Sequence, residues 1–128
     1  FRDLPKSVTH LCIDPWYKVQ VSPTVPSGVT HFTYGLSYRG VCVELPETCT
    51  HLKIYANLER NLWYPYVTHV KFSGKFNQSI KNSWMLRLTH MVFCKSYKLP
   101  ISGLIPPGLV YLRYCGKVYR GSEIDIFR

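Results

Sequence analysis

A threonine–histidine pair recurs along this 128-residue chain at nearly constant spacing. All five histidines of the sequence belong to such a pair, and the pair Val110-Tyr111 continues the series. The intervals from one pair to the next are 21, 20, 18, 21 and 21 residues. A period of this length indicates a repeat protein, in which each unit packs against its neighbours. The five pairs begin at Thr9, Thr30, Thr50, Thr68 and Thr89.

The residues around each pair follow one apolar pattern. Six strand-like segments read VTHLCI, VTHFTY, CTHLKI, VTHVKF, LTHMVF and LVYLRY, with apolar first, fourth and sixth places. Because side chains alternate across a strand, the fourth and sixth places should point inward and the third and fifth outward. The pattern therefore predicts two buried ladders. The fourth-place ladder is Leu11, Phe32, Leu52, Val70, Met91 and Leu112, and the sixth-place ladder is Ile13, Tyr34, Ile54, Phe72, Phe93 and Tyr114.

The remainder of each unit favours extended backbone. A proline comes two or three residues before five of the six segments, and Trp84-Met85-Leu86 takes its place in the fifth unit. An aromatic residue or leucine follows each segment, a role expected for Val118 or Tyr119 in the last unit. Proline and glycine on the short return path favour turns and polyproline-like structure. We therefore predict a leucine-rich-repeat-like solenoid of 18–21-residue repeats, with a parallel β-sheet on the concave side, an irregular or extended convex side and little helix.

The alternative fold is an antiparallel sandwich of regularly spaced strands, which does not account for the shared Thr-His register. The length fits a single domain. We predict one solenoid domain over residues 1–128. Its six repeats are expected at about 4–25, 26–44, 45–62, 63–83, 84–104 and 105–128.

Several units resemble the FNIP repeat, whose consensus reads roughly LPxSVTHLxFGxxFNQPI. The resemblance is carried by residues 4–11 (LPKSVTHL) and, most closely, by residues 67–80 (VTHVKFSGKFNQSI). It extends through all six units, although the FNQ segment is degenerate elsewhere and the sixth unit lacks the Thr-His pair. FNIP repeats occur in many proteins of social amoebae and giant DNA viruses. In viral members they often follow an F-box, a segment that docks onto a ubiquitin-ligase adaptor and that these 128 residues do not contain. The resemblance implies a substrate-reading role.

The outward places are where function is expected, because they line the concave face of a solenoid. One hypothesis is a partner-contacting surface, and another is a structural ladder in which each imidazole ring packs on the next. A metal site is disfavoured, because no carboxylate or cysteine accompanies the histidines at fixed spacing. The candidate partner-binding residues are His10, His31, His51, His69, His90 and Tyr111 at the third place, with Lys53, Lys71 and Arg113 at the fifth.

Charge separates the two halves of the chain. Residues 1–59 hold five basic and five acidic side chains, whereas residues 60–122 hold ten basic side chains and no acidic one. Such a basic half could attract nucleic acid, an acidic protein or anionic lipid, or could serve solubility alone. We expect a basic stripe near the strand exits and along one edge of the solenoid. It comprises Lys75, Lys95, Lys98, Lys117 and Arg120, with Lys71 and Arg113 adjoining it on the concave side.

Other signals are mostly negative. The sequence has no paired catalytic acids, phosphate loop or triad signature, so we expect neither an enzyme nor a cofactor. The longest apolar runs are too short to span a membrane. Five cysteines, an odd number without C-x-x-C spacing, predict mostly buried free thiols in an intracellular, reducing compartment, cytoplasmic or virus-associated. The sequon Asn77-Gln78-Ser79 is interpreted as part of the repeat.

Two function classes follow. The first is a non-enzymatic scaffold for protein–protein interaction, in the finer form the substrate-recognition part of an F-box ubiquitin-ligase subunit. The second is a basic structural or virion-associated protein that binds nucleic acid or an acidic partner. An F-box upstream of Phe1 would favour the first class over the second.

Overall fold

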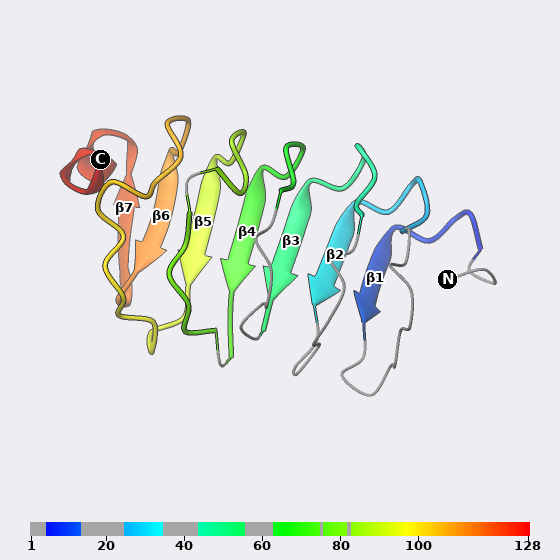
Figure 1. The fold of residues 1–128 in the computed structure, drawn as a ribbon, viewed down its shortest axis with the longest axis horizontal. Helices are drawn as coiled ribbons and strands as arrows, with labels where there is room; N and C mark the ends of the chain where they lie inside the picture. The colour runs from blue at the N-terminus through cyan, green and yellow to red at the C-terminus, as the bar shows by residue number, and fades with distance from the viewer. Residues whose placement is uncertain (1–4, 14–24, 35–43, 56–62, 75, 82) are drawn as a thin grey trace.

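The computed structural model describes residues 5–13, 25–34, 44–55, 63–74, 76–81 and 83–128. Its centre is one seven-stranded sheet in which sequence order and spatial order coincide (Figure 1). Strands β1 to β6 are parallel and β7 is antiparallel to β6. The strands are β1 (His10–Ile13), β2 (His31–Tyr34), β3 (His51–Ile54), β4 (His69–Phe72), β5 (His90–Phe93), β6 (Tyr111–Tyr114) and β7 (Lys117–Arg120).

The register of the sheet follows the Thr-His pairs. Each third-place residue lies opposite the third-place residue of the next strand, from His10 opposite His31 to His90 opposite Tyr111. The peptide nitrogens of each Thr-His pair anchor this register: those of Thr30 and His31 both donate to the carbonyl of Thr9, over 2.7 and 3.0 Å. The same bond pair recurs in every later unit through Val110 and Tyr111. The register holds although the intervals between pairs differ by up to three residues.

The predicted ladders form the core. Phe32, Leu52, Val70, Met91 and Leu112 are buried at the fourth place, and Ile54, Phe72 and Phe93 are buried at the sixth. The first and last rungs, Leu11 and Tyr114, are partly buried and pack against this core. The side chains of Ile13 and Tyr34 lie outside the described part. At Phe72 and Phe93 the rings stack with centroids 5.0 Å apart, so identical places in successive units do contact one another.

A tight turn precedes each of the six parallel strands. The first-place residue of each segment donates its backbone N–H to the carbonyl three residues earlier, as Val8 does to Pro5 over 3.2 Å and Val67 to Tyr64 over 3.2 Å. Proline opens this turn in four units, at Pro5, Pro26, Pro46 and Pro106. Tyr64 and Met85 open it in the fourth and fifth units. Pro65 in the fourth unit and Pro107 in the sixth occupy the second position of their turns. Proline suits either position because its φ is already fixed.

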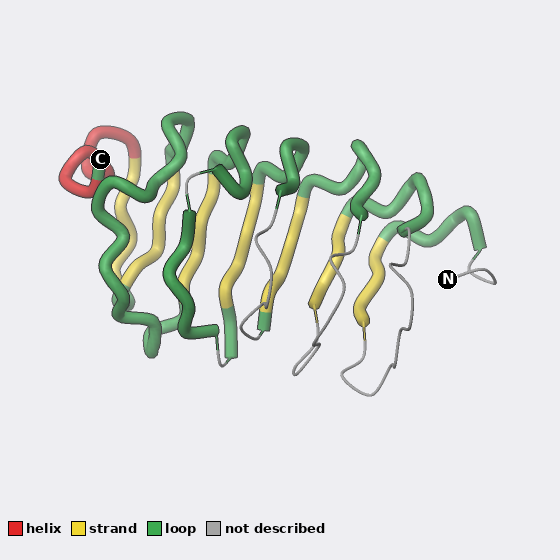
Figure 2. Tube along the Cα trace, in the orientation of Figure 1, coloured by secondary structure: helices red, strands yellow, loops and turns green. Residues whose placement is uncertain are grey.

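The convex side is extended, as predicted. Phe76, Ile80, Tyr97 and Ile101 are buried at the places expected to be apolar, and Phe76 stacks on Phe72 with centroids 4.4 Å apart. Across the described ranges, helix occurs only as the 3-10 segment η1 (Gly121–Phe127) at the C-terminal end, visible in red in Figure 2. The leucine-rich-repeat-like solenoid prediction is confirmed. The corresponding residues Tyr17, Val21, Tyr38, Cys42, Leu58 and Leu62 lie outside the described part.

The C-terminal end differs from the prediction. Instead of continuing around the solenoid, the chain reverses at Cys115 and Gly116, whose φ angles are +52° and +78°. Two positive φ angles in succession are what a two-residue hairpin of type I′ requires. Val118 is therefore exposed on β7 and does not fill the expected convex place, whereas Tyr119 packs edge-on against Phe127 of η1. In η1, Ile124 is fully buried, so the hairpin and helix cover the last rung of the core.

Candidate partner-binding groove

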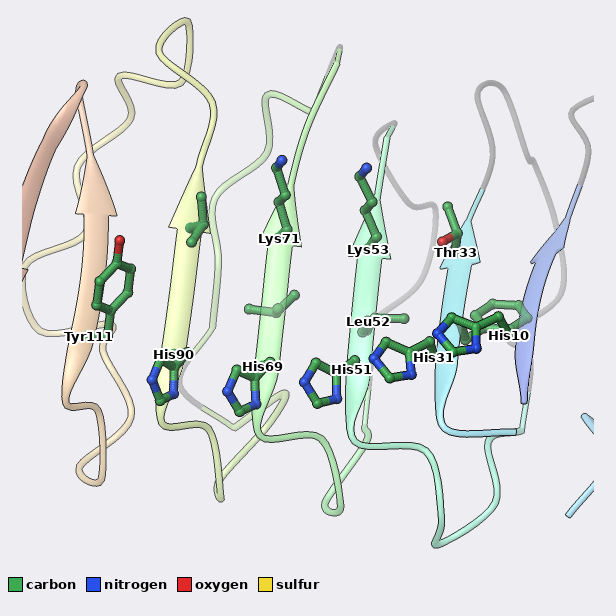
Figure 3. A pocket seen from close by; sticks show the side chains of 13 residues that line it. His10, His31, Thr33, His51, Leu52, Lys53, His69, Lys71, His90 and Tyr111 are labelled. Carbon is green, nitrogen blue, oxygen red and sulfur yellow. The ribbon is translucent and has the colours of Figure 1, made fainter. Parts of the chain in front are cut away.

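The five histidines form one continuous stack on the concave face. Successive ring centroids from His10 to His90 lie 4.1, 4.2, 4.3 and 4.2 Å apart, and the rings are within 20° of parallel. Tyr111 extends the stack, with its ring 5.6 Å from that of His90. Figure 3 shows these side chains side by side, one from each parallel strand. In-register parallel strands lie about 4.8 Å apart, so planar side chains at one place stack almost in contact.

Threonine hydroxyls hold the rings in this orientation. In each pair the threonine Oγ1 lies 2.8 or 2.9 Å from Nδ1 of the histidine that follows it. The hydroxyls of Thr30, Thr68 and Thr89 also donate to the backbone carbonyl of the threonine one unit earlier, over 3.2, 3.3 and 3.1 Å. The histidine stack is therefore tied to the sheet by its neighbouring side chain, and the stacked-ladder interpretation of these residues accounts for the Thr-His spacing.

The stack forms one wall of a groove of about 370 Å³ that runs across the strands. The lining also includes Val92, whose side chain is half-buried at the outer fifth place, and Leu52 and Val70, whose side chains are buried in the core. The polar lining comprises Thr33, Lys53 and Lys71 beside the histidines and Tyr111. In Figure 3 the two lysines project from β3 and β4 on the same face as the imidazole rings. The groove thus combines an apolar floor with a histidine row and a parallel row containing two ammonium groups.

The electrostatic character of the groove is entirely basic. Lys53 and Lys71 lie opposite each other on β3 and β4, and the described lining includes no carboxylate. Arg113 is exposed at the same fifth place on β6, outside the lining itself. The Nζ atom of Lys53 lies 4.9 Å from the centre of the Tyr55 ring, a cation–π distance. An uncompensated basic groove is an arrangement that attracts anionic groups.

The histidine stack resists protonation. Burial is the largest cause that lowers the pKa of His31, His51 and His69 from the ordinary value of 6.5. Repulsion from neighbouring histidines lowers each pKa further. At neutral pH these three rings are therefore uncharged, and the permanent positive charge of the groove comes from its lysines.

The residues of the expected basic stripe lie in two separate regions, one near the strand exits and one beside Tyr111. Lys95 and Lys98 are exposed beyond the exit of β5, and a Cβ at Gly116 would meet the Lys95 side chain at 3.8 Å, so Lys95 lies beside the β6–β7 turn and near Lys117. Arg120 does not lie with them near the strand exits. It pairs with Tyr111 across the hairpin, and its guanidinium lies 5.5 Å from the Tyr111 ring centre. Lys75 lies outside the described residues.

Arg120 thus lies against the groove residue Tyr111, a position that the sequence pattern missed. Reading KVYR after Gly116 as an antiparallel strand would have placed its first and last residues on opposite faces and revealed it. The stack consequently ends in a cation: four histidine–histidine contacts, then Tyr111, then Arg120.

Metal and thiol chemistry add little to this surface. In the part of the chain that the structure describes, no group of three or more His, Cys, Asp and Glu side chains could hold a metal ion. Cys49 is buried, and burial raises the pKa of its thiol to about 11. Cys94 is half-buried, but Cys12 and Cys115 are exposed, so the expectation of mostly buried thiols is wrong for these two. Cys49, Cys94 and Cys115 are free thiols, and Cys42 lies outside the described residues. No helix among the described residues is long and apolar enough to cross a membrane.

Comparison with known proteins supports the fold. No protein-family pattern and no curated protein sequence matches the chain. Among solved structures it is similar to CroV588, a giant-virus protein described as a novel circular leucine-rich-repeat structure. The two are 28% identical with a TM-score of 0.69, and the match covers 88% of this chain and 18% of that one. The chain therefore spans less than a fifth of the length of CroV588 and shares its leucine-rich-repeat-like fold.

Proposed function

We propose that this chain is a non-enzymatic repeat scaffold that binds a protein partner in its concave histidine groove. Leucine-rich-repeat-like folds are a common scaffold for protein interaction, and the extended sheet face of a solenoid provides the binding surface. The observation that carries the proposal is the groove itself, which joins an apolar floor to uncompensated basic groups. Apolar contact supplies binding free energy, and the cations favour an acidic segment of the partner.

A pair of charge reversals tests where the partner binds. Lys53→Glu/Lys71→Glu reverses the two groove lysines, and Lys95→Glu/Lys98→Glu reverses two exposed lysines outside the groove lining. Proteins captured by the wild-type chain and identified by mass spectrometry should be retained by the second variant and lost by the first. Equal retention by both variants, with both shown to be folded, would contradict binding in the groove.

The finer proposal is that the groove reads substrates for an F-box ubiquitin ligase, cytoplasmic or virus-associated. Its support is the FNIP resemblance of the repeats, and the free thiols of Cys49, Cys94 and Cys115 fit a reducing compartment. The likeness to a giant-virus protein is consistent with a viral source. Co-purification of a ubiquitin-ligase adaptor with the protein expressed from its complete gene would support the proposal, and its absence would contradict it.

The second candidate, a nucleic-acid-binding component, is favoured by one specific observation. Lys95 and Lys117 lie near each other at the exit edge of the sheet, in the half of the chain without acidic residues up to position 122. Polyanion binding at this edge would be separate from the groove and is tested by its own variants below.

A further inference from the structure

The hydrogen bonds of the threonine hydroxyls indicate which ring nitrogen carries the proton in the stacked histidines. A threonine hydroxyl has one proton to donate and can also accept. For Thr30, Thr68 and Thr89, Oγ1 lies 3.1–3.3 Å from the carbonyl of the preceding unit and 2.8 Å from the adjacent imidazole Nδ1. Both contacts are hydrogen bonds only when the hydroxyl donates to the carbonyl and Nδ1–H donates to the hydroxyl. If the hydroxyl instead donated its proton to Nδ1, no hydrogen atom would remain for the contact between the hydroxyl and the carbonyl oxygen.

In their neutral form, the rings of His31, His69 and His90 therefore carry their proton on Nδ1, which leaves Nε2 as an unprotonated acceptor. Within the described ranges, no protein group bonds Nε2 of a stacked histidine, although all five rings line the groove. The tautomer follows from the network of contacts around the threonine. At neutral pH the groove thus presents a row of Nε2 lone pairs alongside Lys53 and Lys71.

A further proton enters this stack without disturbing it. It would bind at Nε2, while the chain from Nδ1–H through the threonine hydroxyl to the carbonyl remains intact. The hydrogen bond from Nδ1–H to the threonine is the same in the neutral and in the protonated ring. What a row of protonated rings would need in addition is an anion close to each Nε2–H group. Among the described residues, the titratable and charged groups that face it include no carboxylate. They are Cys12 on β1, Lys53 on β3, Lys71 on β4, Tyr111 and Arg113 on β6, and Arg120 on β7. The nearby carboxylate Glu123 of η1 accepts from the Arg120 backbone N–H instead.

We infer that the stack is a proton-coupled anion site, in which carboxylates of an extended acidic protein segment accept hydrogen bonds from Nε2–H groups that become protonated as the segment binds. The inference rests on the proposed function for the identity of the partner. Each ligand carboxylate supplies the countercharge that the groove lacks, so ligand binding and proton binding stabilise each other. Mutual repulsion along the stack is relieved by the same anions.

An extended segment can run along the stack without matching it ring for ring. Alternate side chains of an extended chain are about 6.8 Å apart. The rings are 4.1–4.3 Å apart, so successive carboxylates on one side of the segment would be separated by roughly one and a half ring spacings. Lys53 and Lys71 lie on the same face as the histidines, two residues further along β3 and β4. Their ammonium groups would bind the acidic segment before the histidines are protonated.

A capped hexaglutamate peptide is a suitable probe, because glutamate remains ionised between pH 6 and 8. Its Kd is measured by calorimetry at pH 8, 7 and 6 and constant ionic strength, in buffers of different ionisation enthalpy. We expect net proton uptake on binding, with Kd falling about tenfold per pH unit for each proton taken up. Binding without proton uptake and with a constant Kd would overturn the inference. It would leave the proposed function standing, since that is tested separately by partner capture.

Matched variants separate the histidines from the lysines. His51→Asn/His69→Asn should reduce proton uptake and flatten the pH dependence of Kd. Lys53→Gln/Lys71→Gln should weaken binding at every pH while retaining proton uptake. If the first variant keeps the full proton uptake, the inference fails. Tighter and equally proton-linked binding of an oligothymidylate of equal charge would overturn the assignment to a protein segment.

The protein without any ligand gives an independent result. Nitrogen chemical shifts at pH 7.5 should show the Nδ1–H tautomer for His31, His69 and His90. Thr68→Val, which removes the acceptor of the His69 ring, should shift that ring alone toward the Nε2–H form. Nε2–H tautomers at all three histidines of the wild-type protein would overturn the inference whatever the binding data show.

Discussion

The guanidinium of Arg120 lies 5.5 Å from the centre of the Tyr111 ring, directly beyond the last histidine of the concave stack. The contact joins the antiparallel strand β7 to the functional face, since Tyr111 and Arg120 are paired across the hairpin. The C-terminal end of the solenoid therefore contributes to the groove as well as covering the core.

The central core should be sensitive to truncation. Phe72 is fully buried and stacks on both Phe76 and Phe93, so Phe72→Ala should lower the free energy of unfolding by about 3–5 kcal/mol. Urea denaturation followed by circular dichroism measures the change. Leu86→Ala is the matched control, because Leu86 is exposed, and it should change stability by about 0.5 kcal/mol or less. A small loss for Phe72→Ala would contradict the continuous ladder.

Stability should depend on pH through the histidine stack. The pKa values of His31, His51 and His69 are lowered in the folded chain, whereas an unfolded histidine titrates near 6.5. Between these values the unfolded chain binds more protons, so the free energy of unfolding should fall as the pH drops from about 6.5 through the folded-state pKa values. Urea denaturation at pH 7.5 and 5.5 measures the loss. An NMR titration in which all three histidines have ordinary or raised pKa values would count against it.

The hairpin turn should tolerate only glycine at its second position. Gly116 has a φ of +78°, and a Cβ there would make only an ordinary contact with the Lys95 side chain. Gly116→Ala should therefore destabilise the chain by about 1 kcal/mol through backbone strain alone. Gly108→Ala is the control, since Gly108 has no positive φ and its Cβ would lie 3.7 Å from the Leu88 carbonyl oxygen. Thermal unfolding of both variants should show a lower Tm only for Gly116→Ala.

Nucleic acid, if bound, should be held by the exit edge of the sheet. Lys95→Glu/Lys117→Glu should then weaken RNA and DNA binding without unfolding the chain, and should reduce the slope of log Kd against log salt by about 0.9 for each duplex phosphate contact removed. Lys6→Glu/Lys81→Glu changes two exposed lysines elsewhere and serves as the control. Fluorescence anisotropy at several salt concentrations measures both effects. Salt-independent binding, or equal weakening by both variants, would exclude this edge as a nucleic-acid site.

The sequence predicted the strands and much of the groove because both depend on a local repeat. Once Thr9 and Thr30 are aligned, alternation alone assigns Phe32 inward and His31 outward, and the structure agrees. The C-terminal hairpin was missed because the sixth unit was aligned as another turn of the solenoid. The chain reverses through positive φ angles at Cys115 and Gly116. Glycine commonly adopts a positive φ, but cysteine does not, so the residue type at position 115 did not indicate the turn. The position of Arg120 then depended on that reversal.

Stacked identical strands in parallel register, with like side chains over like, are also the arrangement of an amyloid fibril. Such a sheet has no intrinsic end, because each new strand meets the same pattern of backbone groups as the last. Strand β7 runs in the opposite direction, and η1 folds over the core behind it. The hairpin thus makes the C-terminal edge a poor template for a further parallel copy, and limits self-association in a sheet that would otherwise favour fibre growth.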